Sequence, residues 1–417
     1  MYMKENKKMK VGIGFATGRK SFQKVLKTYV YSWWESDMPG KEDVELNLLV
    51  AYDLKYTNTK IKDYTGISRD VRDIIDNTYF YSTEAIQQET EYLVNEKVIT
   101  EKEAKLLFGG GYAGKRNAIL YGAVKNKLDY LIFLDDDEYP MAVTKTLSTT
   151  VWGGQRVLLE HLTHIKDADI TNGHHCGYIS PIPYISFDDR LTESDFRLFI
   201  EAISNDIVSW DKIYALMKNG GVTYADTRIL TTDEAPEVEE VNHSKFISGA
   251  NLCINLTQPQ RVSPFYNPPG ARGEDTFLST CLRERKVLRV PCYTFHDGFS
   301  MYSHLMDGVL PIQLRYIKAD SEAIITRFFK ACIGWIRYKP LLLYITRRDD
   351  YDEQIQLMRE NLRATLPQIC AYFGRDEFMD ISSELERFNT NVKKHYRQFI
   401  ETQQAWEKIM TYFSEKE

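Results

Sequence analysis

The sequence lacks long apolar runs, cysteine pairs and an excess of positive charge, and each absence excludes a class of protein. No stretch reaches the roughly 18 uninterrupted apolar residues of a membrane-spanning helix. The six cysteines are scattered without a Cys-x-x-Cys pair, which fits a reduced cytosolic protein better than a disulfide framework or a zinc site. The net charge of −6 gives no indication of nucleic-acid binding. The basic N-terminus leads directly into a strand-like run and has no signal-peptide apolar region.

The composition that is present is typical of a soluble globular protein. The chain has 417 residues, of which 43% are hydrophobic and 27% are charged. This length is enough for one large domain or for about two to three smaller ones.

The most informative stretch is an apolar strand that ends in a run of carboxylates. Residues 129–134 are rich in β-formers and are typical of a buried strand, and four carboxylates follow at residues 135–138 before the breaking Pro140. Ligands of open α/β sheets bind beyond the carboxyl ends of strands. A divalent cation held by carboxylates would neutralise this charge. A solvated acidic turn or an N-cap cluster for the next helix is the structural alternative.

The N-terminal part of the chain predicts a β-α-β unit. Residues 11–19 form a strand that ends in a glycine loop, Ser21 is suited to cap a helix, and residues 44–53 form a second strand. Such a unit implies a right-handed crossover and a parallel pair of strands.

Three glycines in the first strand and its loop suggest a dinucleotide-binding fingerprint. Gly12 and Gly14 lie within the strand pattern, however, and the spacing to Gly18 is one residue too long for G-x-G-x-x-G. We therefore expect a strand and a tight loop that brings the backbone close to a ligand.

A glycine-rich segment with a basic pair precedes the acidic strand. Residues 109–114 contain four glycines, Lys115 and Arg116 follow, and a helix is predicted over 117–124. Backbone N–H groups at a helix start favour a phosphate when cations lie beside them. A flexible loop with a solvated basic turn is the alternative.

Three further signals follow in order along the chain. Residues 246–254 are predicted as a strand with a central Ser-Gly-Ala-Asn, residues 272–278 place Glu-Asp at the start of a helix, and residues 290–298 form a strand that ends in His-Asp.

Taken together, these motifs resemble glycosyltransferases of the GT-A fold, particularly the large family-2-type group, over roughly residues 10–305. The resemblance implies an α/β fold in which helices flank a mixed, Rossmann-like sheet. It also implies an Asp-x-Asp motif that binds Mn²⁺ or Mg²⁺, which grips the diphosphate of a nucleotide-sugar.

The resemblance assigns roles to residues of this sequence. It implies metal ligands at Asp135, Asp137 and His296, and catalytic carboxylates at Asp275 and Glu274, with Asp275 as the base of an inverting transfer. It implies donor contacts at Thr17, Gly18, Arg19, Asp53, Lys115, Arg116, Asn117, Asp136 and Gly249.

The chemistry of glycosyl transfer needs groups of these kinds. The leaving diphosphate must be neutralised, the acceptor hydroxyl must lose a proton, and water must be kept out. We expect a UDP- or GDP-sugar donor, and a glycan, a lipid-linked molecule or a small molecule as the acceptor. Some GT-A enzymes retain configuration and need no base, so the stereochemistry stays open.

Two other functions compete with this interpretation. A sugar-nucleotide nucleotidyltransferase on a related fold is disfavoured because the first loop lacks Gly-x-Gly-Thr-Arg. A non-catalytic divalent-cation-binding scaffold would bind metal without nucleotide, although residues 135–138 do not follow EF-hand spacing.

The middle of the chain, residues 151–245, is longer than a compact GT-A domain needs. Its segment 169–177 is predicted as a strand followed by a site loop, and His174, His175 and Cys176 suggest zinc, but no second ligand pair follows. Acceptor contact or plain packing is the preferred interpretation. Residues 226–242 are acidic and are predicted as a mobile loop that could act as a lid.

The C-terminal part is predicted to be helical. Residues 324–345 form a basic, aromatic, amphipathic helix that Pro340 ends or kinks. This helix either docks on the catalytic domain, which we favour, or makes peripheral membrane contact. Apolar residues at a seven-residue spacing predict a long helix that packs in a homodimer or in a monomeric hairpin; they are Leu385, Val392, Phe399, Trp406 and Phe413.

The predicted organisation is a GT-A catalytic domain over residues 1–308 and a helical extension over residues 309–417. The nucleotide-binding half covers about residues 1–140, and the acceptor half covers about residues 141–308. We expect a cytoplasmic protein, with peripheral attachment to the inner face of the membrane as a further hypothesis.

Overall fold

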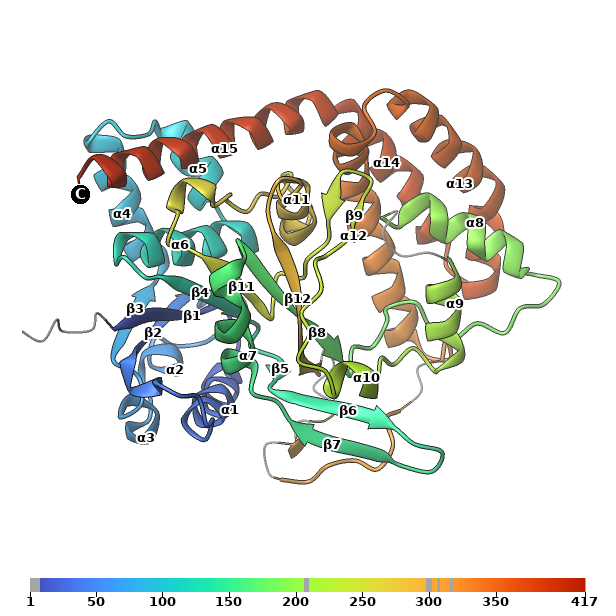
Figure 1. Cartoon of the computed structure of the whole chain (residues 1–417). Helices are drawn as coiled ribbons and strands as arrows, with labels where there is room; N and C mark the ends of the chain where they lie inside the picture. Colours follow the sequence, from blue (N-terminus) through green and yellow to red (C-terminus); the bar gives the residue numbers. More distant parts are fainter. Residues whose placement is uncertain are drawn as a thin grey trace, which may run out of the picture.

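A mixed sheet forms the centre of the protein (Figure 1). The computed structural model describes residues 8–205, 210–297, 302, 304–305, 308–315 and 318–416. Within these residues the main sheet has eight strands in the order β3-β2-β1-β4-β11-β8-β12-β5. The strands are β1 (Met9–Thr17), β2 (Val44–Tyr52), β3 (Asn77–Tyr81), β4 (Tyr130–Leu134), β5 (Glu138–Tyr139), β8 (Ile170–Cys176), β11 (Leu252–Asn255) and β12 (Val287–His296).

Helices cover the sheet and continue as a C-terminal helical region, so the predicted α/β class with a mixed sheet and a helical tail is confirmed. The helices of the first half are α1 (Phe22–Trp34), α2 (Lys62–Thr65), α3 (Arg69–Arg72), α4 (Thr83–Asn95), α5 (Glu101–Phe108), α6 (Tyr112–Lys125) and α7 (Val157–His164). The later helices are α8 (Glu193–Ile203), α9 (Trp210–Lys218), α10 (Thr227–Leu230), α11 (Glu274–Thr280), α12 (Glu322–Thr346), α13 (Tyr351–Phe373), α14 (Asp380–Thr390) and α15 (Val392–Glu415).

The first four strands of the sheet are parallel, as the β-α-β pattern predicts. Strand β1 pairs in parallel with β2 and with β4, and β2 pairs in parallel with β3. Gly12 and Gly14 lie inside β1, where a Cβ atom at Gly14 would come within 2.8 Å of the Ile119 side chain of α6. Gly14 therefore lets α6 pack closely on the sheet.

The predicted strand over 246–254 is wrong for its first six residues. Strand β11 begins only at Leu252, and residues 246–251 form a loop. The Asn172 side chain donates to the carbonyls of Ala250 and Asn251, and Asn251 has a positive φ of 50°. A side chain of β8 thus takes the backbone groups that a neighbouring strand would have used.

One predicted helix boundary also changes. Helix α6 begins at Tyr112 and not at residue 117, so Lys115 and Arg116 lie inside the helix, after its first turn. Helix α12 covers the predicted residues 324–345 and continues through Pro340 to Thr346, so of the two effects predicted for this proline, ending the helix is wrong. The predicted strand over 290–298 is β12, and Gly298 lies outside the described residues.

The C-terminal helices share a core with part of the middle segment. Helices α8 and α9 pack with α12, α13 and α14 around one apolar cluster, and these helices lie together on one side of the molecule (Figure 1). The apolar side chains of α12 enter this cluster, which agrees with the docking interpretation of that helix. Membrane contact through residues 324–345 stays a prediction.

Helix α15 leaves this group and returns to the first half of the chain. It runs over the top of the view in Figure 1 and packs against α5. Ala405, Trp406, Ile409 and Met410 are buried there in a cluster with residues of α5 and α6. The predicted long helix is wrong at its start, because Leu385 lies in α14 and Asn391 separates that helix from α15. The seven-residue pattern thus serves contacts within one chain, and the homodimer stays a prediction.

The predicted lid segment, residues 226–242, is held against the sheet. It contains α10 and the short strand β9 (Glu240–Val241), which pairs with β10 (Ser244–Lys245). The Val238 amide donates to the Val287 carbonyl of β12, at 2.8 Å. Beyond the acidic run, β6 (Met141–Lys145) and β7 (Thr150–Gly154) form an antiparallel hairpin at the lower edge of Figure 1.

Candidate functional site

The acidic run lies at the carboxyl end of β4, beside the first loop. All five residues of β4 are hydrophobic and buried, so the strand ends where the carboxylates begin, at Asp135. Asp136 accepts hydrogen bonds from the Thr17 hydroxyl and from Arg19, whose guanidinium also pairs with Asp137. Burial raises the pKa of Asp136, while Arg19 and Thr17 oppose that rise. The structure thus brings Thr17 and Arg19 to the carboxylates, and their predicted contact with a donor stays a prediction.

Arg116 joins four separate segments of the chain at this edge of the sheet. Its buried guanidinium, on α6, donates to Asp135 at 3.0 Å and to the Gly249 carbonyl, and its Nε lies 3.7 Å from a Glu274 oxygen. The aromatic rings of β4 and of the chain before α11 flank it, with centroids at 5.4 and 5.6 Å. Arg116 therefore fixes the acidic run relative to the start of α11.

Gly249 allows this close approach. A Cβ atom at this position would lie 3.0 Å from the Arg116 guanidinium and 3.5 Å from the Cβ of Asp275. The glycine predicted as a donor contact thus also has a packing role. A side chain there would move Arg116 away from its carboxylates.

Asn117 has a structural role that the motif does not reveal. Its side chain is fully buried, donates to the carbonyls of Leu107 and Phe265, and accepts from the Phe265 amide at 2.8 Å. These hydrogen bonds tie α6 to the segment that leads to α11. The predicted donor contact of Asn117 stays a prediction.

The first turn of α11 carries the predicted catalytic carboxylates. Asp275 accepts a hydrogen bond from the Thr276 amide at 2.8 Å. Burial and then the neighbouring Glu274 raise the pKa of Asp275 to about 6, although Thr276, Arg116 and Gly249 oppose the rise. Gly273, with a φ of 108°, precedes the helix and packs under the ring of Tyr338 from α12. A carboxyl with this pKa is suited to accept a proton near neutral pH.

Strand β12 brings His296 to the acidic run. Pairing of β12 with β5 sets His296 opposite Glu138, and the His296 Nε2 atom lies 3.7 Å from an Asp137 oxygen. The Nδ1 atom of His296 is buried and has no hydrogen-bond partner among the residues that the structure describes. The predicted metal ligands Asp137 and His296 are thus brought together.

Beside Asp137 and His296 lies a second buried cluster, around Glu138, that sequence reasoning missed. Glu138 accepts from the Thr294 hydroxyl at 2.7 Å and lies 3.1 Å from His175 Nδ1. Burial alone would raise the pKa of Glu138, but His175, His296 and Thr294 together lower it to about 2. The His-His-Cys pattern drew attention to His175, but only the pairing of β8, β12 and β5 reveals its carboxylate partner.

The donor atoms at this edge suit a hard divalent cation. Burial, with smaller contributions from the carboxylates of Glu138, Asp137 and Asp136, raises the pKa of Asp135 to about 7 against the effect of Arg116. Within the described ranges, however, no group of three or more His, Cys, Asp or Glu side chains is arranged to hold a metal ion. Arg19, which is paired with Asp137, supplies positive charge in this arrangement.

Asp53 and Lys115 lie at the mouth of a neighbouring groove. Their side chains are 3.3 Å apart at the carboxyl end of β2, and Lys115 together with Lys55 lowers the pKa of Asp53, against the effect of burial. The groove has a volume of about 590 Å³ and lies between α4 and α5. Gly18, predicted with these residues, packs against Tyr56 in the first loop, where a Cβ atom would lie 2.6 Å from the Tyr56 Cβ.

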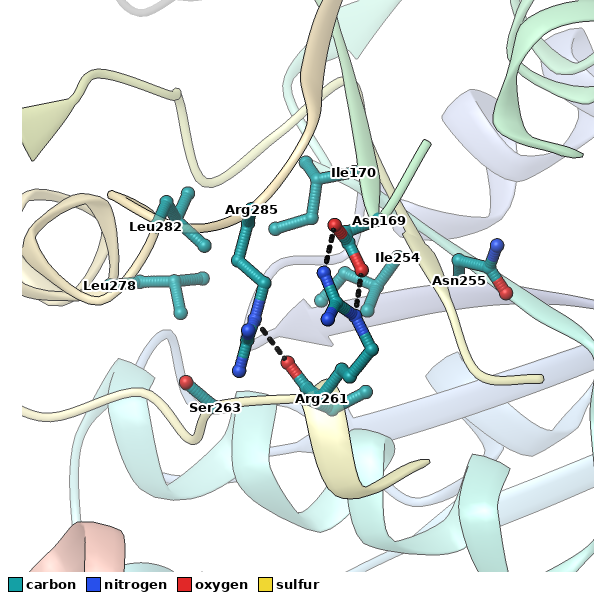
Figure 2. Close-up of a pocket in the computed structure, with 10 residues that line it drawn as sticks. Asp169, Ile170, Ile254, Asn255, Arg261, Ser263, Leu278, Leu282 and Arg285 are labelled. Atoms are coloured by element: carbon teal, nitrogen blue, oxygen red, sulfur yellow. Dashed lines mark hydrogen bonds and ion pairs between the residues drawn. The ribbon is translucent and has the colours of Figure 1, made fainter. Parts of the chain in front are cut away.

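A much smaller cavity lies at the far end of β8, away from His175 (Figure 2). It has a volume of about 10 Å³ and is bounded by Asp169 and by two arginines. Arg261 pairs with both Asp169 oxygens at 2.6 and 2.8 Å, and Arg285 donates to the Arg261 carbonyl. This cluster ties β8 to the segment before α11 and has room for about one water molecule.

No family model matches the sequence, and no curated protein matches it. In the part of the chain that the structure describes, no helix has the length and apolar character needed to cross a membrane.

Proposed function

We propose that the protein is a metal-dependent glycosyltransferase that moves a sugar from a nucleoside diphosphate donor to an acceptor hydroxyl. The observation that supports this function best is the convergence on buried Arg116. Asp135 from the end of β4, the Gly249 loop and Glu274 from the start of α11 all meet its guanidinium. These are the segments that the GT-A resemblance assigns to metal, donor and base.

In this proposal, the start of α6 receives the diphosphate. Its first N–H groups follow the flexible residues 109–111, and Lys115 and Arg116 add positive charge one turn later. An anion at a helix N-terminus is favoured by both the free N–H groups and the helix dipole. Asp53, at the end of β2, would contact the nucleoside beside Lys115, with which it pairs.

Asp135, Asp137 and His296 would hold Mn²⁺ or Mg²⁺. A cation bound there supplies Lewis-acid neutralisation of the leaving diphosphate. Asp275 accepts the proton of the acceptor hydroxyl, and its raised pKa makes it a stronger base than an ordinary aspartate. Glu274 keeps that pKa raised through its negative charge. Attack from the Asp275 side, opposite the diphosphate, would invert the configuration of the sugar.

A thermal-shift panel tests this function directly. UDP, GDP, CDP and dTDP are each added with Mn²⁺, Mg²⁺ or EDTA, because a ligand that binds the native state raises its apparent stability. We expect one diphosphate to raise the melting temperature only with metal, and Asp137→Ala to abolish that rise. The exposed Asp189 provides a matched control, Asp189→Ala, that keeps it.

Two results would reject the proposal. If metal alone raises the melting temperature and none of the four nucleotides changes it, the protein is a cation-binding scaffold. A nucleotide shift that is unchanged in EDTA and in Asp137→Ala would reject the metal-dependent site.

A further inference from the structure

Tyr178 follows β8 at the edge of the sheet that carries the candidate site. Strands β4 and β8 both pair antiparallel with β11, and β8 pairs in parallel with β12, so the carboxyl ends of β4, β8 and β12 lie on one edge. Asp135 follows the first of these strands, Tyr178 follows the second and His296 ends the third. Tyr178 is therefore placed where a ligand of such a sheet would bind.

The ring of Tyr178 lies beside the predicted metal ligand and near the predicted base. Its centroid is 5.4 Å from that of the His296 ring, and the two ring planes are tilted by 49°. Burial raises the pKa of the Tyr178 phenol, Arg327 opposes this rise, and the nearby charge of Asp275 adds to it. Burial and then the same carboxylate also raise the pKa of Tyr338 from α12. Tyr178 is thus a neighbour of both groups that the proposed reaction uses.

The backbone around Tyr178 is held from two sides, while its side chain stays 38% exposed. The Thr223 amide donates to the Tyr178 carbonyl at 3.0 Å. The Arg327 guanidinium of α12 donates to the next two carbonyls, those of Ile179 and Ser180, at 2.7 and 3.1 Å. An aromatic side chain on a fixed backbone loses little freedom on binding, so this ring is preorganised to contact a ligand.

The charges near this ring favour an acceptor without charge. Asp275 must be ionised to take a proton, so it would repel an anionic acceptor. The guanidinium of Arg327 already donates to backbone carbonyls, and that of Arg289 on β12 donates to the carbonyls of Gly173 and Phe246, both at 3.0 Å. Both arginines are therefore engaged in holding the backbone, and an acceptor phosphate would have to displace those contacts to be neutralised by them.

The exposed ring face suits a sugar. The face of an aromatic ring carries partial negative charge, and the C–H groups on one face of a sugar ring carry partial positive charge. A stacked sugar also has hydroxyl groups at its rim, which can donate to the Asp275 carboxylate.

We propose that Tyr178 is the stacking platform for the acceptor and that the acceptor is an uncharged carbohydrate. This inference rests on the proposed glycosyl transfer and narrows its acceptor to one class. The sugar ring lies on the exposed face of Tyr178, and one of its hydroxyls donates to Asp275. As the hydroxyl oxygen bonds to the anomeric carbon of the donor, its proton passes to Asp275. The bond from that carbon to the diphosphate breaks, and its electron pair leaves with the diphosphate.

Saturation-transfer NMR of the full chain tests the binding, with Mg²⁺ and the nucleoside diphosphate that the thermal-shift panel selects. The probes are the methyl glycosides of glucose, galactose, mannose and N-acetylglucosamine. Farnesyl phosphate, an anionic lipid, and methylumbelliferone, a flat aromatic alcohol, are the comparison probes. We expect at least one methyl glycoside to bind and neither comparison probe to bind.

Variants of Tyr178 separate the flat ring from its bulk. Tyr178→Ala should weaken binding of that glycoside by about tenfold, because the stacking contact is lost. Tyr178→Phe keeps the ring and should bind like the unaltered protein, whereas Tyr178→Leu keeps apolar volume without the flat face and should bind like Tyr178→Ala. Tyr92, which is 42% exposed on α4, provides the matched control, and Tyr92→Ala should leave binding unchanged.

Turnover separates a stacking platform from a merely structural residue. In Tyr178→Ala we expect the KM for the acceptor to rise by about tenfold, while the KM for the donor and the thermal shift with its diphosphate stay the same. If Tyr178→Ala instead abolishes that thermal shift, the ring supports the donor site and the inference is wrong.

The failure of this inference can be told from the failure of the proposed function. If a diphosphate binds with metal but no methyl glycoside does, or if Tyr178→Ala binds the glycoside unchanged, only the inference is wrong. Binding of farnesyl phosphate or methylumbelliferone in place of the glycosides would assign another class of acceptor and would also overturn it. If no nucleoside diphosphate binds, the proposed function fails and this inference fails with it.

Discussion

Arg116 is buried among carboxylates, and its position affects the protonation of two of them. Its guanidinium opposes the rise in pKa of Asp135 and of Asp275, which still reach about 7 and about 6. Removing a partner from such a buried group leaves the other charge without compensation. At the scale of single residues, the site therefore works as one electrostatic unit.

Asp275→Asn should stop transfer and spare donor binding. The amide cannot accept the acceptor proton, so we expect the rate to fall by about 10²–10⁴-fold. Turnover with the best nucleotide-sugar and the thermal shift with its diphosphate should be measured on the same preparation. Asp189→Asn serves as the control. Near-full turnover in Asp275→Asn would show that Asp275 is not the catalytic base.

The pH profile of transfer should report the same carboxyl. Because Asp275 must be deprotonated to act and its pKa is about 6, kcat/KM should rise with pH through about 6 and then level off. Glu274→Gln removes a neighbouring negative charge, so the acidic limb should move to lower pH, by up to about one unit. If the acidic limb of the kcat/KM profile of Glu274→Gln lies at the same pH as in the unaltered protein, a group other than Asp275 controls it.

His161 should make stability depend on pH. Burial lowers its pKa from 6.5 to about 4, and its ring bonds Thr171 and Asn251 at 2.7 and 2.9 Å. Below pH 6.5 the unfolded chain takes up a proton that the native state does not. The His161 contribution is therefore complete above pH 6.5 and is lost as the pH falls to about 4, on the order of 3 kcal/mol.

Urea unfolding between pH 4 and pH 7, the window set by these pKa values, measures this loss. We expect His161→Gln to be less stable at neutral pH but to lose less stability on acidification. His243→Gln, at an exposed position, should keep the slope of the unaltered protein. An unchanged slope in His161→Gln would contradict the assignment.

At the scale of elements, the sequence predicted the strands whose apolar runs end in polar residues. Strands β1, β2, β4 and β12 are such runs, and their carboxyl ends hold Thr17, Asp53, Asp135 and His296. The strand prediction for residues 246–251 failed because the conformation of this segment depends on a side chain that is distant in sequence. That side chain is Asn172, which hydrogen-bonds the backbone there. The sequence prediction also missed the contact of Glu138 with His175, which depends on strand pairing over long separations.

Gly14→Val tests the packing of α6 on β1. A Cβ atom there would lie 2.8 Å from the Ile119 Cγ2 atom, so the helix that carries Arg116 must shift. We expect a loss of about 1–3 kcal/mol in the free energy of unfolding, typical of overpacking. Gly153→Val in β7 meets open space and should cost far less. Chemical denaturation of both variants makes the comparison, and equal stabilities would contradict it.

At the scale of the whole molecule, α15 connects the C-terminal helices to the first half of the chain. Lys102 pairs with Glu401 at 2.7 Å and Lys408 with Glu103 at 2.5 Å, on either side of the buried Trp406. The ion pairs are exposed and contribute little. The apolar contact of Trp406 therefore carries most of this attachment.

Trp406→Ala should destabilise the protein strongly. A fully buried tryptophan replaced by alanine leaves a cavity and costs about 3–5 kcal/mol. Trp34→Ala, at a position that is 58% exposed, is the matched control and should change stability by well under 1 kcal/mol. Thermal unfolding of both measures the difference, and equal melting temperatures would show that α15 is not a structural part of the first half.

The return of α15 also has a consequence for synthesis on the ribosome. The apolar side chains of α5 and α6 emerge about 300 residues before Ala405 and Trp406, which complete their cluster. At roughly 5–20 residues per second, the nascent chain exposes this surface for about 15–60 s. During that time the first half of the chain is a substrate for chaperones, and slowing translation would prolong that exposure.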